Sequence, residues 1–241
     1  MPVKAPGRPA RKRRASATRR RDAVATRERI FSAATREFAS HGFGGARVDR
    51  ISRRARTFDR MLYYHFGNKE QLFRVVLEGA YEKLWAAEER LDLARADPVA
   101  GVRQLVAFTW QYYVDHPEFI RLLNSENLQQ GRNVRRSSRV GKLSSPFIRI
   151  IADLLARGAE QGVFRAGVDP VKLYITVAAL GYFYVSNRYT LTHFLGVDLM
   201  GERERAEWLA HITDVVLAYL APHHRGAVLT PRARARENRR N

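Results

Sequence analysis

The sequence predicts an all-α protein of about nine helices with a basic segment at each end. Proline stands where the first turn of a helix would begin at four places: Pro98, Pro117, Pro146 and Pro170. Asp or Ser precedes three of these prolines and suits the N-cap position. Glycine follows an apolar-periodic stretch, where helices commonly end, at four other places: Gly42, Gly67, Gly162 and Gly196. No stretch alternates apolar and polar residues between hairpin turns, so we expect no strands.

These signals and the apolar periodicity between them place the helices at about residues 26–41, 48–55, 59–65, 69–94, 98–115, 117–127, 145–161, 170–194 and 203–220. Residues 129–143 are polar, Arg-rich and contain glycine, which indicates a mobile loop. Large apolar residues are scarce in residues 1–24 and 223–241, so both ends are expected to be disordered. The predicted organisation is a basic arm (1–24), a small helical head (25–71), a larger helical body (72–222) and a basic tail (223–241).

The positive charge is concentrated at the ends and in the head. The net charge is +19, of which residues 1–22 carry +8, residues 23–70 carry +5 and residues 223–241 carry +5. Residues 71–222 are nearly neutral at +1. This asymmetry indicates a polyanionic partner for the ends and the head, and a different partner for the body. The alternative for the two ends is that they only keep the protein soluble.

Several classes of protein are not expected. Cysteine is absent, which removes disulfides, thiol catalysis and cysteine-ligated metals, and the seven histidines show no metal-binding spacing. No phosphate-binding glycine loop, nucleophile elbow or paired-acid motif is present, so we expect no enzyme and no cofactor. The longest apolar run, 173–185, is too short to span a membrane, and no secretory signal follows the basic start. We expect a cytoplasmic protein without a membrane partner.

The head has the pattern of a helix-turn-helix. Apolar residues share one face of the first helix at Ile30, Ala34 and Phe38, and the second helix directs Val48, Ile51 and Ala55 inward. After the short connection at 56–58, Leu62 and Phe66 anchor a third helix whose other side is rich in Tyr, Arg and His. A helix of this kind suits the major groove of double-stranded DNA.

This region resembles the N-terminal domain of TetR-family regulators. The resemblance rests on 31–38, 41–43, 48–51, 54–55 and 61–73, above all on Leu-Tyr-Tyr-His-Phe at 62–66 followed by Asn-Lys-Glu at 68–70. It covers about 50 residues; the rest of the chain is similar to the family in helix number and in its two apolar last helices.

The resemblance implies DNA contacts residue by residue. Arg47 and Lys69 would each bind a phosphate, Asp59, Arg60 and Met61 would face base edges, and Tyr63, Tyr64 and His65 would lie along the sugar-phosphate backbone. For the two tyrosines, helix packing is the alternative. The predicted contact set also includes Val48, Arg50, Thr57 and Phe58.

The turn departs from the family pattern at two positions. Arg56 stands where the family has Gly at a positive φ, and Phe58 stands where the recognition helix has a Ser-like N-cap. We expect Thr57 or Asp59 to take over the cap, or the helix to order on DNA, with Phe58 free to meet a thymine methyl.

The N-terminal arm suggests further DNA contacts. Gly7-Arg8-Pro9 resembles the core of an AT-hook, which enters a narrow minor groove, but the usual Arg before Gly is replaced by Pro6. The broader hypothesis is an arm that adds non-specific phosphate contacts and steepens the salt dependence of binding by roughly 0.9 per phosphate in log–log slope.

The body is expected to bind a small-molecule effector of unknown identity. Aromatic residues run through 98–220 with a few polar groups among them, as in a ligand cavity, although most aromatics at helical spacing are core. The predicted ligand contacts are Trp110, Tyr112, His116, Phe119, Asn127, Tyr184, Asn187 and Arg188.

The last two helices are expected to form a homodimer. Apolar stripes run along them at Leu173, Val177, Leu180, Trp208, Ile212 and Val215. The resemblance implies that such helices pair with those of a second copy as a four-helix bundle, which would make the operator near-palindromic. The alternative is that the stripes face the chain's own core.

Together these features predict a sequence-specific DNA-binding transcription regulator, a repressor that a small molecule releases from its operator, located at the nucleoid when bound. Two alternatives stay open: a ligand-dependent activator, and an architectural DNA-binding protein with weak sequence preference.

Overall fold

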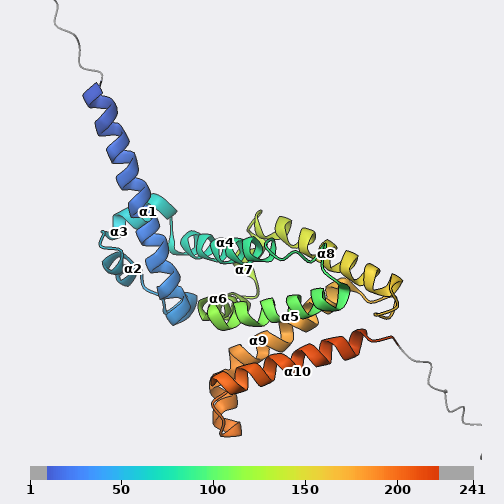
Figure 1. The fold of residues 1–241 in the computed structure, drawn as a ribbon. Coiled ribbons are helices and arrows are strands. Elements are labelled where there is room, and N and C mark those ends of the chain that lie inside the picture. The colour runs from blue at the N-terminus through green and yellow to red at the C-terminus, as the bar shows by residue number, and fades with distance from the viewer. Residues whose placement is uncertain (1–9, 223–241) are drawn as a thin grey trace, which may run out of the picture.

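The computed structural model describes residues 10–222, and all of their side chains except those of 10–19 and 141–145. Within this range the chain forms ten helices and no strand, which confirms the all-α prediction (Figure 1). The helices are α1 (Ala10–Gly45), α2 (Val48–Arg54), α3 (Asp59–Phe66), α4 (Lys69–Glu88), α5 (Pro98–Asp115), α6 (Pro117–Leu128), α7 (Arg132–Arg135), α8 (Val140–Glu160), α9 (Pro170–Leu195) and α10 (Glu202–Leu220).

Three of the predicted helix starts are confirmed by side-chain caps. Asn68 accepts a hydrogen bond from the Gln71 N–H at the start of α4, and Asp97 accepts one from the Ala100 N–H at the start of α5. At the start of α9, Asp169 accepts from two N–H groups, those of Val171 and Lys172. These carboxyl and amide oxygens satisfy N–H groups that have no partner inside the helix.

The structure differs from the sequence prediction in four places. Helix α1 begins at Ala10, so residues 10–24 of the expected disordered arm are helical and project beyond the rest of the head (Figure 1). Residues 129–143 are not one mobile loop, because they contain α7 and the first turn of α8. Helix α8 passes through Pro146 instead of starting there, and α4 ends at Glu88, earlier than expected. The AT-hook-like residues 6–9 and the tail 223–241 lie outside the described residues.

Helix α7 is held by a single buried carboxylate. Glu126, at the end of α6, accepts hydrogen bonds from the backbone N–H groups of Asn133 (2.6 Å) and Val134 (2.9 Å) and from the Asn133 side chain. Arg136 and Arg132 then pair with Glu70 of α4. A distant residue therefore supplies the stabilisation that the local sequence of α7 does not signal.

The molecule contains two separate hydrophobic cores. The head core joins α1–α4 and includes the predicted residues Ile30, Ala34, Phe38, Ile51, Ala55, Leu62 and Phe66, all buried. The body core joins α4, α5, α6, α8, α9 and α10 around Leu105, Trp110 and Ile151. Leu122 of α6 is buried in the head core, so α6 and α4 are the elements that connect the two parts.

Candidate nucleic-acid interface

The turn between α2 and α3 is built on an arginine in the left-handed region. Arg56 has φ 52°, as expected from its place in the family pattern. The N–H of Thr57 donates to the Ser52 carbonyl (3.0 Å) and that of Arg56 to the Arg53 carbonyl (3.1 Å). This is the bond pattern with which a helix ends on a left-handed residue, a position that glycine occupies without strain. The Ala55 carbonyl accepts a hydrogen bond from Arg29, which fixes the turn against α1.

Helix α3 starts without a side-chain cap. Phe58 is the N-cap residue, and neither Thr57 nor Asp59 replaces the missing cap; only the Met61 N–H closes the first turn, on the Phe58 carbonyl at 2.9 Å. The Phe58 ring is 71% exposed, and the Arg60 guanidinium lies 5.6 Å from its centre. The start of α3 therefore presents an apolar ring, a cation and the Asp59 carboxylate to solvent.

The outer side of α3 carries most of the residues predicted to contact DNA. Tyr64 is 78% exposed and Tyr63 about half exposed, so neither tyrosine is a core residue. Met61 is half-buried against the head core. His65 is also half-buried: its ring contacts those of Tyr64 and Phe66, and its Nε2 has no hydrogen-bond partner within the described residues.

One residue that the sequence analysis missed organises the start of α2. Glu37 of α1 is 2% exposed, and its Oε1 accepts hydrogen bonds from the Arg47 N–H (3.1 Å) and the Arg50 guanidinium (2.6 Å). Burial on its own raises the pKa of Glu37, but the hydrogen bonds from Arg47 and Arg50 outweigh it and the net pKa is lowered. Glu37 thus provides, from another helix, the cap that the Arg47 side chain does not give.

The positions of Arg50 and Val48 do not agree with the prediction that these two residues contact DNA. Arg50 is not left for phosphate, because its guanidinium is bound to Glu37 and to the Gly45 carbonyl (2.6 Å). Val48 packs partly against the head core. Arg47 and Arg53 are exposed and flank Asp49, each at 3.0 Å from its carboxylate.

Lys69 begins α4 beside the head core. Its ammonium lies 4.8 Å from the centre of the Phe43 ring and is half-buried. Burial is the main influence on the pKa of Lys69 and lowers it, against the opposing charge of Glu37. Phe43 therefore holds this cation at the first turn of α4, next to α3.

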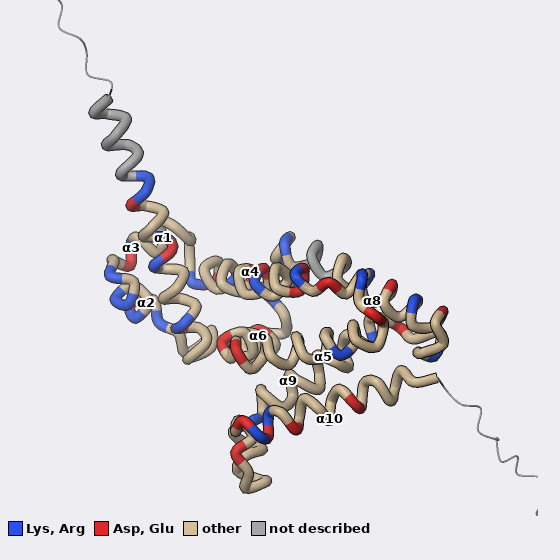
Figure 2. The backbone as a smooth tube through the Cα atoms, viewed as in Figure 1, with Lys and Arg blue, Asp and Glu red and all other residues tan. Residues whose placement is uncertain are grey.

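The charge of the described head is concentrated on one end of the molecule. Figure 2 shows Lys and Arg gathered on α2 and the start of α3, at the end farthest from α8, whereas acidic and basic residues alternate over the body. No group of three or more His, Asp or Glu residues in the described part of the chain is arranged to hold a metal ion. None of the described helices has the length and apolarity needed to cross a membrane.

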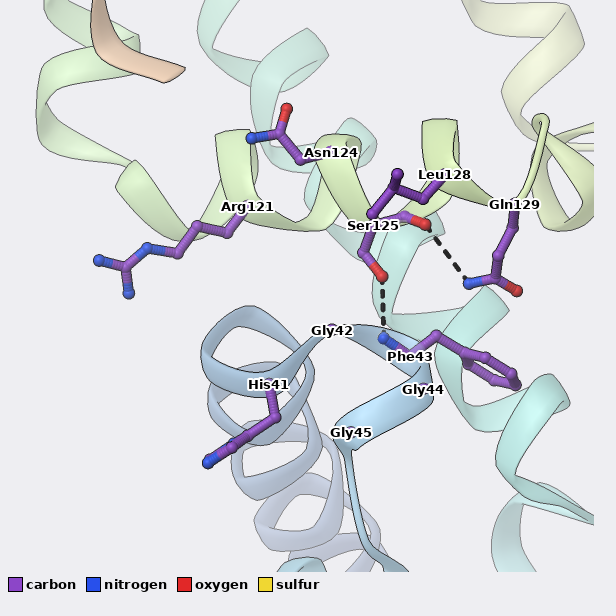
Figure 3. Close-up of a pocket in the computed structure, with 10 residues that line it drawn as sticks. All are labelled: His41, Gly42, Phe43, Gly44, Gly45, Arg121, Asn124, Ser125, Leu128 and Gln129. Carbon is purple, nitrogen blue, oxygen red and sulfur yellow. Dashed lines mark hydrogen bonds between the residues drawn. The ribbon is translucent and has the colours of Figure 1, made fainter. Parts of the chain in front are cut away.

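A polar joint connects the head to the body. The Phe43 N–H donates to the Ser125 hydroxyl of α6 at 2.8 Å, directly after Gly42, whose φ is 63° (Figure 3). The surface pocket at this joint has a volume of about 470 Å³ and is lined by His41, Gly42, Phe43, Gly44, Gly45, Arg121, Asn124, Ser125, Leu128 and Gln129. On its other side α6 is tied to α9, because Asn124 binds both Ser186 and the Tyr182 hydroxyl.

The structure does not bring the predicted ligand residues into one site. Tyr112, His116 and Phe119 line a small cavity of about 20 Å³ between α1, α4, α5 and α6. The Tyr184 ring instead contacts those of Trp110 and Trp208, and its hydroxyl donates to the Leu199 carbonyl. Asn127 is exposed, Asn187 binds the Phe183 carbonyl of its own helix, and Arg188 lies over the Tyr189 ring.

The predicted dimerisation stripes face mainly inward. Leu173, Val177 and Ile212 are buried in the chain's own core, and Leu180 and Trp208 pack against it with part of their surface exposed. Of the predicted set only Val215 is exposed. Other apolar residues of α9 and α10 are exposed: Val171, Ile175, Phe183, Tyr189, Phe194, Leu195, Val215 and Tyr219.

A helix-turn-helix head with an exposed, basic reading surface, joined to a larger helical body, defines the chain as a DNA-binding transcription regulator. Two family models match it: the model for bacterial regulatory proteins of the tetR family over residues 30–76, and the model for a tetracyclin repressor-like C-terminal domain over residues 98–216. The chain belongs to the TetR family.

Similar proteins cover nearly the whole described fold. The HTH-type transcriptional repressor NicS of Pseudomonas putida is 43% identical over 85% of this chain and 96% of its own length. The HTH-type transcriptional repressor SCO4008 of Streptomyces coelicolor is 34% identical over 68% of this chain and 81% of its own length. Among solved structures, the fatty acid degradation regulator FadR from Bacillus halodurans superimposes with a TM-score of 0.61 at 19% identity, over 80% of this chain and 94% of that one.

Proposed function

We propose that the protein is a homodimeric repressor that binds a near-palindromic operator and is released from it by a small molecule. The observation that carries the proposal is the exposed face of α3, set on a buried helix-turn-helix core in a chain 43% identical to a named repressor. A DNA-bound protein of this kind acts at the nucleoid, in the cytoplasm.

The proposed reading surface is the start and outer side of α3. Asp59 and Arg60 face base edges in the major groove. Phe58 contacts thymine methyl groups there, because its exposed ring stands at the start of the recognition helix. Met61 sits at the same end but shares its surface with the head core. Tyr63 and Tyr64 contact the sugar-phosphate backbone.

The proposed phosphate contacts flank this helix. Arg47 at the start of α2 and Lys69 at the start of α4 are cations held at helix N-termini, where backbone N–H groups also favour an anion. Thr57 in the turn and His65 at the end of α3 border the same surface. Arg50 stabilises this surface indirectly, through its hydrogen bond with Glu37.

The proposed dimer forms through the exposed apolar face of α9 and α10. Large apolar side chains in a continuous exposed patch mark an interaction surface, and a two-fold pair presents the same patch from both copies. Two recognition helices related by this axis reach successive major grooves, which is why a near-palindromic operator is expected.

The proposed release is a population shift. A ligand that binds the body more tightly when the two heads are spaced wrongly for DNA lowers the operator-bound fraction. The joint at Phe43 and Ser125 and the continuous helix α4 are the contacts through which the body positions the head.

Selection of bound fragments from random double-stranded DNA tests the proposal. Purified full-length protein is expected to enrich a near-palindromic sequence, and a footprint on that sequence should show two protected half-sites about one helical turn apart. Equal retention of random fragments would instead establish the architectural alternative. A protein in which Tyr64 is replaced by Ala should lose affinity for every fragment, since a backbone contact carries no sequence information.

A further inference from the structure

A second surface pocket lies in the seam between the head and the body, beside the joint at Phe43 and Ser125. It has a volume of about 520 Å³ and lies where α1, the end of α2 and the start of α6 meet. Arg36 of α1, Arg54 of α2 and Arg121 of α6 line it. Arg121 also lines the joint pocket, so the two pockets adjoin at this residue, whose side chain extends from α6 into open space (Figure 3).

The arginines of this seam pocket have no anionic partner. Arg36 and Arg54 are exposed, and neither forms a hydrogen bond or an ion pair with any residue that the structure describes. Arg121 is also exposed, and within the described residues it donates only to the Tyr189 hydroxyl of α9, at 3.3 Å. Three guanidinium groups from three helices therefore surround one hollow, and none of them is paired with a carboxylate.

The other residues of the seam pocket have short or already paired side chains. Glu118 is the one carboxylate that lines it, and its Oε1 lies 3.3 Å from a ring nitrogen of His116. The Ser40 hydroxyl is exposed and forms no hydrogen bond with the described residues, while Ala39 and Pro117 add small apolar surfaces. The lining therefore carries three positive charges against one negative charge, with a free hydroxyl group beside them.

This arrangement selects an anion whose charges are spaced apart. A guanidinium group presents its N–H donors in a planar fork that fits a carboxylate through two parallel hydrogen bonds. The three arginines come from three helices, so a compact anion can meet only part of the set. A molecule with two or more carboxylate groups can pair with several of them at once, and each pair also reduces the repulsion among the arginines.

We propose that Arg36, Arg54 and Arg121 form a binding site for a small organic polycarboxylate between the head and the body. This site goes beyond the proposed function, because it adds a second ligand to the effector of the body. The ligand joins two arginines of the head to one of the body, across the seam that Phe43 and Ser125 also bridge. It therefore restrains the orientation of the head relative to the body.

Isothermal titration calorimetry of the full-length protein without DNA tests the site. The probes are citrate, succinate and inorganic phosphate at one fixed, low ionic strength, because salt screens exposed charges. Citrate, with three carboxylates, is expected to bind most tightly and phosphate most weakly. The proposal is overturned if phosphate binds as tightly as citrate, or if citrate does not bind at millimolar concentration.

Two substitutions remove a charge from the pocket without removing a described contact. Arg36→Gln and Arg54→Gln should each weaken citrate binding roughly three- to tenfold, because a charge-assisted hydrogen bond is lost at an exposed site. Arg103→Gln is the matched control, since Arg103 is an exposed arginine of α5 with no partner among the described residues and lies outside this pocket. It should leave the affinity unchanged. An equal loss in all three variants would mean that citrate follows the net charge of +19 instead of the pocket.

Glu118→Gln should change the affinity in the opposite direction. It removes the one carboxylate of the lining, so citrate should bind roughly two- to fivefold more tightly. Damage to the fold does not increase affinity, so this variant separates an effect of charge from a loss of structure at the seam. Unchanged or weaker citrate binding by Glu118→Gln would contradict the proposed site.

The calorimetry contains no DNA, so its result is independent of operator binding. If the random-DNA selection fails while citrate binds through Arg36 and Arg54, the proposed repressor function is wrong and the polycarboxylate site stands. If an operator is found and no probe binds, only the seam site is wrong.

Discussion

Two residues of this protein are held in arrangements that lower its stability. Arg56 occupies a left-handed backbone conformation in the turn before the recognition helix, and the carboxyl group of Glu88 is buried with no hydrogen bond to another described side chain. Both arrangements carry an unfavourable free energy that a simple substitution would remove. Each therefore gives a prediction in which the variant is more stable than the original chain.

Arg56→Gly should increase the free energy of unfolding by about 0.5–1 kcal/mol, since glycine adopts a positive φ without strain. Urea unfolding monitored by circular dichroism measures the change. Gln130→Gly is the matched control, because Gln130 is the other described non-glycine residue at positive φ (57°) and lies outside the head. Both variants should gain stability, but only Arg56→Gly should also weaken DNA binding, through the loss of a basic charge. A destabilised Arg56→Gly would contradict the strain argument.

Glu88→Gln should change the pH dependence of stability. A carboxyl group whose pKa is raised from 4.5 to about 7 by folding destabilises the folded state as pH rises through this interval. The variant should match the original chain below about pH 4.5 and exceed it by up to about 3 kcal/mol above pH 7, at about 1.4 kcal/mol per pKa unit. Urea midpoints at about pH 5 and pH 8 measure the difference. An equal gain at both pH values would mean that the Glu88 charge is not responsible.

The two residues differ in how far the sequence predicted them. The positive φ of Arg56 follows from its place in a recognisable motif. The roles of Glu37 and Glu88 do not, because a glutamate on a helix is usually exposed and its burial depends on helices distant in the sequence. Glu37 is identifiable only once Arg47 and Arg50 are known to lie beside it.

At the scale of elements, the head depends on a few cross-helix hydrogen bonds. Helices α2 and α3 have seven and eight residues and lack side-chain caps of their own, so neither is stable in isolation. Glu37 caps α2 from α1, and Arg29 binds the turn. Local signals predicted the starts of α4, α5 and α9, which carry Asn or Asp caps, but not α7, which Glu126 stabilises from outside.

Glu37→Gln should loosen α2 against α1. The carboxylate accepts from a backbone N–H and a guanidinium, and hydrogen bonds to charged groups contribute roughly 1.5–3 kcal/mol each. The variant should unfold at lower urea concentration and bind the selected operator more weakly, as measured by fluorescence anisotropy. Glu28→Gln, on an exposed position of the same helix, should leave both measurements unchanged. Unaltered operator affinity in Glu37→Gln would show that α2 is positioned by packing alone.

At the scale of the whole molecule, the unpaired face of α9 and α10 is the main departure from the sequence prediction. Helix α9 is apolar on both sides, so its periodicity does not reveal which stripe the body uses and which stays exposed. Leu173 and Val177 belong to the inner stripe, and Ile175 and Phe183 to the outer one. The distinction required the position of α5, against which the inner stripe packs.

Phe183→Glu should prevent assembly, because it places a charge in the centre of the proposed dimer face. Analytical ultracentrifugation is expected to show a monomer for this variant and a dimer for the original chain, with operator affinity falling steeply once one half-site is lost. Val163→Glu, an exposed apolar position outside α9 and α10, is the control and should stay dimeric. A dimeric Phe183→Glu protein would place the interface elsewhere.

The separation of the molecule into two cores has an evolutionary consequence. Substitutions in the body core leave the packing of α1–α3 untouched, apart from the connections through α4 and α6. A duplicated gene can therefore accumulate changes in the body while its copy of the DNA-reading surface stays under selection for the old promoter. New regulatory circuits then arise by changing one half of the protein at a time.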